Sequence, residues 1–398
     1  MAGAPWGAAA VPDRTGPLAG VRVFDLTLWM VGPWAGMRLG ALGADVLHIE
    51  RPGTEPAQLG HVPPTVNGTS IGYLAWNMNK RGLGLDLKNP ADVEAAVDVA
   101  ATCDIFLVNM RPEVVGRLGL GHDVIAARNP GIIYCDVTGW GHHGPMAQSP
   151  GSDGVIQGYC GFWSLNGADG EFYRHYTQMD ASTGELTVLG ALAALRHRRR
   201  TGEGQRIRVS MLKASMYLQS VPLGLTLNGV QLGPRGAASQ VTAPDDVFSC
   251  VDNLHLGISV TSQAQWSALC AAIDRPDLAA DPDYATNAAR LANSEPLTSL
   301  LRDIIGARSR PYWLWRLKGS KVPYGYPLTF EDLRSHDQVR RLGLLPSVPT
   351  PTWGPLITGG SPWTFSRHDT SWTAPPLAGE HSAEILAEVR DARPGERG

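Results

Sequence analysis

Two patterns of apolar and polar residues alternate along the first 140 positions of the chain. Short runs rich in Val, Ile and Leu are typical of strands, and longer segments of helical character separate them. The predicted strands cover 21–27, 44–50, 83–87, 104–110 and 131–140, and the predicted helices cover 33–43 and 90–103. Asn89 and Pro90 mark the start of the second helix, because a polar cap followed by proline is typical of a helix N-terminus. Strands that alternate with helices indicate an α/β fold with a parallel sheet between helices.

The pattern changes in the second half of the chain. A long helix is predicted at 183–200 and a strand at 206–212, whereas residues 221–245 are rich in Gly, Pro and small polar residues and are typical of a linker. A β-hairpin is predicted at 247–260, and further helices at 262–273, 282–293, 295–307 and 378–389. We therefore expect a large α/β domain begun by 1–225, a smaller α+β domain with its linkers at 226–330, and a return to the large domain at 331–398.

The composition is that of a folded globular protein, with 43% apolar and 18% charged residues. A formal net charge of −3 gives no global electrostatic attraction to nucleic acid or to an anionic membrane surface. No run of about 18 apolar residues is present, so no transmembrane helix is expected. Residues 1–17 lack the basic start of a signal peptide, and we expect a cytoplasmic protein.

Neither the cysteines nor the histidines indicate a metal site. The five cysteines are scattered and form no C-x-x-C pair: Cys103, Cys135, Cys160, Cys250 and Cys270. This spacing favours reduced thiols over a disulfide framework or a zinc site. His142 and His143 are adjacent, and neighbouring side chains on an extended segment point to opposite faces. No bound metal is therefore expected.

A dinucleotide site is the first function that alternating strands and helices raise. Glu50 ends the second predicted strand, where NAD-binding proteins place the acid that holds the ribose. The glycine fingerprint is missing, however, because "LWMVGPW" after the first strand contains only Gly32. NAD binding is therefore not expected.

Asp180 lies just ahead of the predicted helix at 183–200, in the stretch "YTQMDASTGE". An acid at this place is either a helix cap or a nucleophile. Residues 182–185 read S-x-x-E, the pattern of a capping box, so a second capping acid would be redundant. The positive end of a helix favours the charged form of a carboxylate, which a nucleophile needs. The residues alone leave both roles open.

Ordered segments along the chain carry a family resemblance. They include "GVRVFDLT", "GPWAGMRLGALGADVLHIERPG", "NMNKRGLGLDLKNP", "DIFLVNMRPEVVGRLGLG", "YCDVTGWGHHGP", "MDASTGELTVLGALAAL" and "LAGEHSAEIL". Over about 17–390 the chain resembles the family III coenzyme A transferases, which include formyl-CoA transferase and carnitine CoA-transferase. The resemblance implies a Rossmann-like large domain with a parallel sheet, a smaller α+β domain and an interlocked homodimer. It also implies transfer of coenzyme A from an acyl-CoA thioester to a free carboxylic acid.

The resemblance also implies roles for individual residues. The covalent nucleophile falls on Asp180, which would form a mixed anhydride and then an aspartyl-CoA thioester. Coenzyme A positions fall on Arg51, Leu85, Lys88, Asn109, Met110, Arg117 and Thr138. Arginine suits this ligand because its planar fork binds phosphate and stacks on adenine. Trp29, Met30 and Trp163 are expected to line an apolar acyl pocket.

Several positions depart from the family pattern. Formyl-CoA transferase has glutamine in place of Met30, lysine in place of Thr138 and a glycine-rich loop whose nearest counterpart here is 235–244. We therefore do not expect formyl and oxalate groups as substrates. The related α-methylacyl-CoA racemases have histidine before Asp153, where this chain has Ser152, and serine is no base near neutral pH. A racemase and an inactive acyl-CoA-binding relative remain the alternatives.

Overall fold

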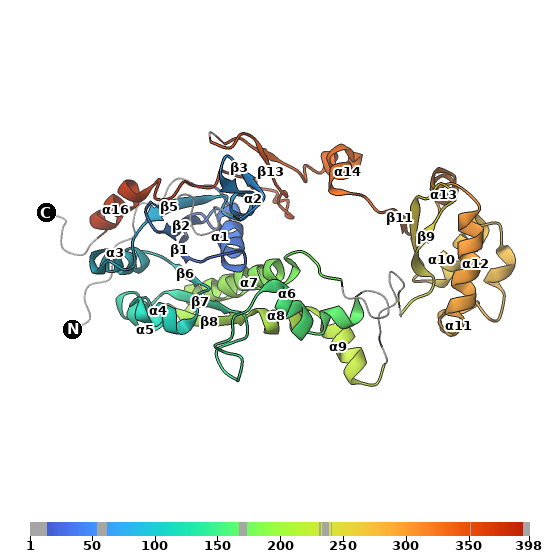
Figure 1. The fold of residues 1–398 in the computed structure, drawn as a ribbon, viewed down its shortest axis with the longest axis horizontal. Coiled ribbons are helices and arrows are strands. Elements are labelled where there is room, and N and C mark those ends of the chain that lie inside the picture. Colours follow the sequence, from blue (N-terminus) through green and yellow to red (C-terminus); the bar gives the residue numbers. More distant parts are fainter. Residues whose placement is uncertain are drawn as a thin grey trace. The chain divides into compact units, whose positions relative to one another are not determined.

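A computed structural model describes residues 14–53, 62–166, 173–230, 232, 239, 241–350 and 352–392 of the chain. The chain divides into two compact units (Figure 1). Unit 1 comprises the residues up to Cys160, Arg174–Val221 and the chain from Arg340 onward. Unit 2 comprises Gly161–Tyr173 and Pro222–Val339.

Unit 1 is built on a six-stranded sheet in the order β5-β2-β1-β6-β7-β8, with every neighbouring pair parallel. The strands are β1 (Arg22–Leu26), β2 (Asp45–Glu50), β5 (Lys80–Gly84), β6 (Ile105–Val108), β7 (Ile133–Thr138) and β8 (Gln205–Ser210). Chain order runs outward from β1 to β5 on one side and from β6 to β8 on the other. The predicted α/β fold with a parallel sheet is confirmed, and its topological switch point lies between β1 and β6.

Successive side chains of each central strand point to opposite faces of the sheet, and helices cover both faces. Val23 joins the core beneath α1 (Val31–Ala41) and α7 (Gln178–Thr201), two helices that pack on each other. Phe24 joins the core beneath α3 (Pro90–Ala101), α5 (His122–Arg128) and α16 (Ser382–Asp391). Burial on both faces explains why these strands read as nearly continuous apolar runs.

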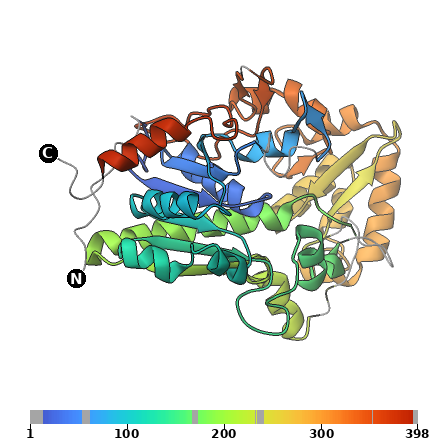
Figure 2. The same cartoon turned by 60° about the vertical axis from the view of Figure 1, so that its left-hand side comes forward.

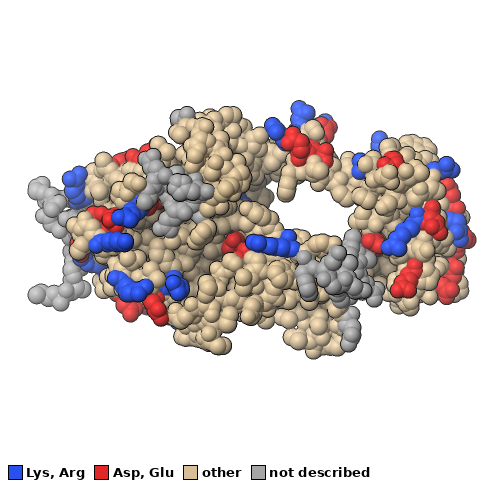
Figure 3. All heavy atoms as spheres, viewed as in Figure 1, with Lys and Arg blue, Asp and Glu red and all other residues tan. Residues whose placement is uncertain are grey.

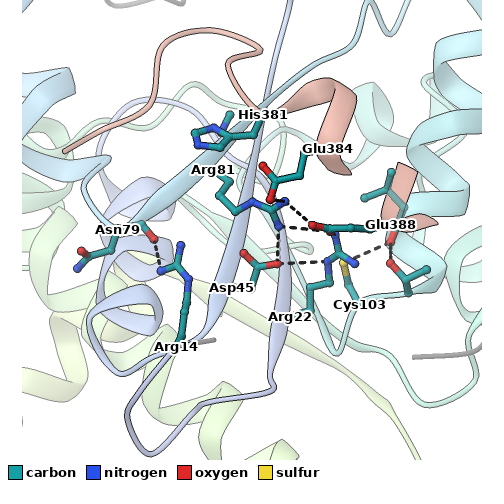
Figure 4. A network of polar contacts seen from close by, with 12 residues as sticks. Arg14, Arg22, Asp45, Asn79, Arg81, Cys103, His381, Glu384 and Glu388 are labelled. Carbon is teal, nitrogen blue, oxygen red and sulfur yellow. Dashed lines mark hydrogen bonds and ion pairs between the residues drawn. The ribbon is translucent and has the colours of Figure 1, made fainter. Parts of the chain in front are cut away.

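The C-terminal helix α16, red in Figure 2, lies beside the N-terminal strands, and buried ion pairs attach it there (Figure 4). Arg81 contacts Asp45 at 3.0 Å and Glu388 of α16 at 2.6 Å. Arg22 contacts the same two carboxylates. His381 accepts a hydrogen bond from the Gly82 amide at 3.2 Å. Four charged side chains therefore connect segments that are more than 300 residues apart in the chain.

Unit 2 contains an antiparallel sheet in the order β11-β10-β9, packed against helices. Its main elements are β9 (Asp245–Ser249), β10 (His255–Ser259), β11 (Tyr324–Gly325), α10 (Gln263–Ala272), α12 (Ser294–Gly306) and α13 (Arg310–Leu317). The predicted hairpin is present, and Asn253 in its turn has a φ of 59°. Trp266, Leu301 and Trp313 are buried at the centre of this unit.

Several element predictions were wrong in their bounds, among them the C-terminal helix, predicted at 378–389 and found as α16 at Ser382–Asp391. The strand predicted at 83–87 is β5 at Lys80–Gly84, because its buried Lys80 and Arg81 look like surface residues in sequence. The long helix begins at Gln178 instead of 183. The helix predicted at 282–293 is α11 (Asn287–Ala292), and the predicted linker at 221–245 includes most of a helix, α9 (Ser220–Leu227).

Charged side chains are mixed in sign on the face that Figure 3 displays. Lys and Arg lie next to Asp and Glu in both units, so the described part of this face carries no continuous basic stripe. Across the described ranges, no helix has both the length and the apolar character needed to cross a bilayer.

Candidate active site

Asp180 lies in the first turn of α7, and a carboxylate from another helix caps this turn. Oδ2 of Asp153, the first residue of α6 (Asp153–Tyr159), accepts hydrogen bonds from the backbone amides of Met179 at 2.7 Å and Asp180 at 3.1 Å. These are two of the amides that a helix leaves without an internal partner. The capping role therefore belongs to Asp153, and the side chain of Asp180 is left for another task.

The predicted capping box at 182–185 is wrong. The Ser182 hydroxyl donates to the Gln178 carbonyl at 2.7 Å, inside the helix. Glu185 accepts from Trp34 Nε1 at 2.9 Å and from Arg38 Nε at 2.8 Å, and so connects α7 to α1. Both side chains have partners other than the helix end because α7 begins four residues before Ser182.

Gln157 fixes Asp153 and the segment that enters α7. Its side-chain amide donates to Asp153 Oδ1 and to the His175 carbonyl at 2.6 Å. Its side-chain oxygen accepts from the His175 amide at 3.0 Å. A single buried glutamine therefore holds both the capping acid and the backbone five residues ahead of Asp180.

The Asp180 side chain is half-buried and close to a second negative charge. Burial and the charge of Asp153 raise its pKa to about 7, while Arg174 acts in the opposite direction. Both effects oppose the expected stabilisation of the carboxylate by the helix, and they outweigh it. At neutral pH the protonated and ionised forms of Asp180 are therefore both populated, and a perturbed carboxyl group of this kind is a candidate for chemistry.

A second feature of unit 1 is a cavity of about 210 Å³ at the carboxyl ends of the strands, beside the switch point. It is lined by residues of the loop after β1, the end of β2, helix α2 (Ile71–Trp76) and the segment after β5. Met110 and Leu118, which lie before and after α4 (Pro112–Arg117), complete the lining. Five predicted site residues lie together in this lining: Trp29, Arg51, Leu85, Lys88 and Met110. Trp29 was predicted for an acyl pocket, and it shares this cavity with the predicted coenzyme A residues.

The chemistry of the cavity suits a planar ring joined to phosphates. Trp29 is 63% exposed and has a φ of 62°, so its ring faces open space from a strained loop. Leu85 and Met110 supply apolar walls. Arg51, which lies 3.5 Å from Asp86, and the exposed Lys88 supply positive charge at the rim. Stacking on apolar walls with cations at the rim is how proteins bind nucleotides.

The remaining predicted residues do not line the cavity. Asn109 accepts from the Leu28 amide at 2.8 Å and donates to the Leu28 carbonyl at 2.6 Å, so its amide holds the loop that carries Trp29. Arg117 is exposed at the end of α4, and Thr138 accepts from the Gly141 amide at 3.0 Å. Met30 is buried at the start of α1. Trp163 belongs to unit 2.

The floor of the cavity contains an ion network that the sequence analysis missed. Lys80 Nζ lies 2.7 Å from Asp25 Oδ2 and donates to Asn77 at 2.9 Å, and His48 Nδ1 lies 3.2 Å from the same Asp25 oxygen. Burial alone would raise the pKa of Asp25, but Lys80 and His48 outweigh it and hold that pKa well below its usual range. The signal available in the sequence was Asp25, a charged residue inside the apolar run of β1.

The loop at 235–244, a metal ion and the residue before Asp153 were also considered in the sequence analysis. Of the loop at 235–244, only Ser239 and 241–244 fall within the described residues. The residues that the structure describes contain no group of three or more His, Cys, Asp or Glu side chains arranged to hold a metal ion. Ser152 occupies the capping position of α6 directly before Asp153, where the racemases have histidine.

Comparison with known proteins places the chain in a family. The model of CoA-transferase family III matches residues 18–382. The chain is 33% identical to the succinyl-CoA:glutarate CoA-transferase of Mus musculus over 381 residues, which cover 95% of this chain and 87% of that protein. It is 31% identical to the formyl-CoA:oxalate CoA-transferase of Streptomyces coelicolor, with 92% and 94% covered. A crystal structure of a CAIB/BAIF family protein from Brucella suis aligns with a TM-score of 0.81 at 30% identity and covers 94% of this chain and 99% of that one.

Proposed function

The chain belongs to CoA-transferase family III and is a CoA-transferase, and from this premise we propose that it moves coenzyme A between carboxylic acids through covalent intermediates on Asp180. The observation that carries the proposal is the half-buried carboxylate of Asp180, whose own helix is capped by a different acid. Its pKa of about 7 keeps a reactive carboxylate available near neutral pH.

The steps follow from the weakness of an anionic acceptor toward a thioester. An Asp180 oxygen attacks the thioester carbonyl, the carbon–sulfur bond breaks, and coenzyme A leaves as a thiolate with a mixed anhydride left on the enzyme. The thiolate attacks the aspartyl carbonyl, which frees the donor acid and leaves an aspartyl-CoA thioester. The acceptor carboxylate then attacks this thioester, and the released thiolate takes the acceptor acyl group from the second anhydride. Asp180 is regenerated without a net change of charge.

We assign the nucleotide end of coenzyme A to the cavity at the strand ends. Arg51 and Lys88 would bind its phosphates, and Trp29, Leu85 and Met110 would enclose the adenine. Asn109 supports this assignment indirectly, because it holds the loop that places Trp29. The buried ions beneath, centred on Asp25, give the cavity a rigid floor.

The acyl groups that we propose are those of short dicarboxylic acids. Support comes from relatives whose names state glutarate together with succinyl-CoA or succinate. Met30 and Thr138, where formyl-CoA transferase has glutamine and lysine, make the smallest acids less suitable.

The test is to supply succinyl-CoA with a panel of mono- and dicarboxylic acids and to follow new acyl-CoA products by liquid chromatography. Omitting the acceptor controls for hydrolysis. New thioesters with glutarate or a similar acid are expected, and no product with any acid would contradict the proposal.

We also propose that the chain works as a homodimer. Helix α8 (Met211–Leu218) ends in three apolar side chains that are 41–70% exposed in the isolated chain: Met216, Tyr217 and Leu218. Contiguous apolar surface of this kind is typical of an interface. Light scattering at low concentration should give twice the chain mass, and a stable monomer would contradict the dimer.

A further inference from the structure

Gly154 leaves room for the side chain of Arg174 near Asp180, the proposed nucleophile. A Cβ atom added to Gly154 would lie only 2.9 Å from both Cζ and Nε of Arg174. Gly154 directly follows Asp153, the acid whose oxygen binds the amide of Asp180. The guanidinium of Arg174 therefore rests on the first turn of α6, beside the two carboxylates.

This guanidinium has no partner of its own among the described residues. No hydrogen bond or ion pair there involves Arg174, and its side chain is exposed. Its charge nevertheless reaches Asp180, whose pKa burial and Asp153 raise and Arg174 lowers. Arg174 lies near Asp153 and Asp180 without pairing with either, so its hydrogen-bond donors are available for the carboxylate of a substrate.

The chemistry of the reaction calls for such a cation. An acceptor acid must bring its carboxylate to a site that already holds Asp153 and Asp180, and like charges repel. A dicarboxylic acid brings a second negative charge that does not react. A planar guanidinium binds a carboxylate through two parallel hydrogen bonds, which fixes both position and orientation.

We propose that Arg174 binds the non-reacting carboxylate of dicarboxylic substrates while their other carboxyl group reacts at Asp180. The inference rests on the proposed function and deepens it, because it assigns the preference for dicarboxylic acids to one residue. Gly154 then has a stated task, which is to leave the space that the guanidinium occupies.

The test compares glutarate with pentanoate, an acid of the same length without the second carboxylate, as acceptors from succinyl-CoA. The variant R174Q should raise the KM for glutarate about 10- to 100-fold, the effect of a lost charged hydrogen bond, and leave the KM for pentanoate unchanged or lower. R174K should recover part of the loss.

G154A provides an independent variant that keeps the arginine. Alanine is favoured over glycine within a helix, so the variant should fold, and its methyl group must displace the end of the Arg174 side chain. G154A should raise the KM for glutarate by less than R174Q does, and it should leave the KM for pentanoate unchanged. Thermal unfolding of each variant reports whether the fold is retained.

Three outcomes separate the possibilities. A selective loss for glutarate in both variants supports the proposal. An equal loss for both acids, with the pH profile moved to higher pH, would show that Arg174 acts only on Asp180 and would overturn the inference while leaving the proposed function intact. Absence of transfer in the unaltered protein would instead overturn the proposed function.

Discussion

Asp25 is buried and Asp180 is half-buried, and the charges next to these two carboxyl groups have opposite sign. Asp25 is fully buried and faces Lys80 and His48, which together hold its pKa well below the usual range. Asp180 is half-buried and faces Asp153, and no cation pairs with it within the described residues, so its pKa rises to about 7. The same side chain is thus a permanent anion in one region and an exchangeable group in the other.

The difference shows where this fold has stabilised charge and where it has left charge uncompensated. Asp25, Lys80 and His48 under the cavity pair with one another, and this pairing fixes the position of the strands that carry them. At the start of α7 the backbone amides of two residues are given to Asp153, so the carboxylate of Asp180 receives little stabilisation. An acid left in this state is a candidate for chemistry.

The largest expected effect is the loss of CoA transfer when the carboxyl group of Asp180 is removed. D180N should lower the rate of CoA transfer at least about 1,000-fold, because the amide cannot form the anhydride. Succinyl-CoA consumption with glutarate measures this. The variant D153N is the matched control, since it keeps the nucleophile, and a comparable loss in both variants would argue against a special role for Asp180.

Next in size is the loss of the cation that neutralises Asp25. K80M should lower the free energy of unfolding by about 3–5 kcal/mol, because it leaves a buried carboxylate without its main partner. Urea unfolding measures the change. K88M, at the exposed lysine of the cavity rim, should stay within about 0.5 kcal/mol of the parent. If K80M were as stable as K88M, Asp25 would not depend on Lys80.

The double variant D25N/K80M sharpens this result. With the carboxylate removed as well, no uncompensated charge remains in the core, so part of the lost stability should return. Additive losses from the two substitutions would contradict an interaction between them.

The sequence predicted the bounds of an element well where residues of that element alone determine them. The runs that form β1 and β2 are apolar on both faces, and their strands were predicted nearly to the residue. β5 was displaced because Lys80 and Arg81 are buried by partners on other elements. The start of α7 was missed because its cap, Asp153, lies 27 residues before Asp180.

The candidate site divides in the same way. The family resemblance nominated Arg51, Leu85 and Lys88, which share one cavity, and also Asp180. It could not give the pKa of Asp180, which depends on burial and on Asp153. Asn109 was assigned to coenzyme A, and the structure shows its side-chain amide hydrogen-bonded to the Leu28 backbone, a contact that the sequence did not predict. The sequence nominated the candidate groups, and tertiary contacts give each of them its surroundings.

The smallest expected effect is a shift in pH dependence. Since the pKa of Asp180 is raised to about 7, the reactive carboxylate accumulates as pH rises through 7, and the transfer rate should rise with it. D153N removes the neighbouring negative charge, which lowers the pKa of Asp180 and should move the profile to lower pH by up to about one unit. Rates from pH 5.5 to 8.5 test this, and a shift to higher pH would contradict the stated coupling.

The most direct test looks for the bond itself. The protein is mixed with succinyl-CoA alone, treated with hydroxylamine or borohydride, digested and examined by mass spectrometry. A modified peptide is expected at Asp180, as the hydroxamate or the reduced alcohol, and D180N should show none. Full turnover with an unmodified Asp180 peptide, or modification at another residue, would contradict the account.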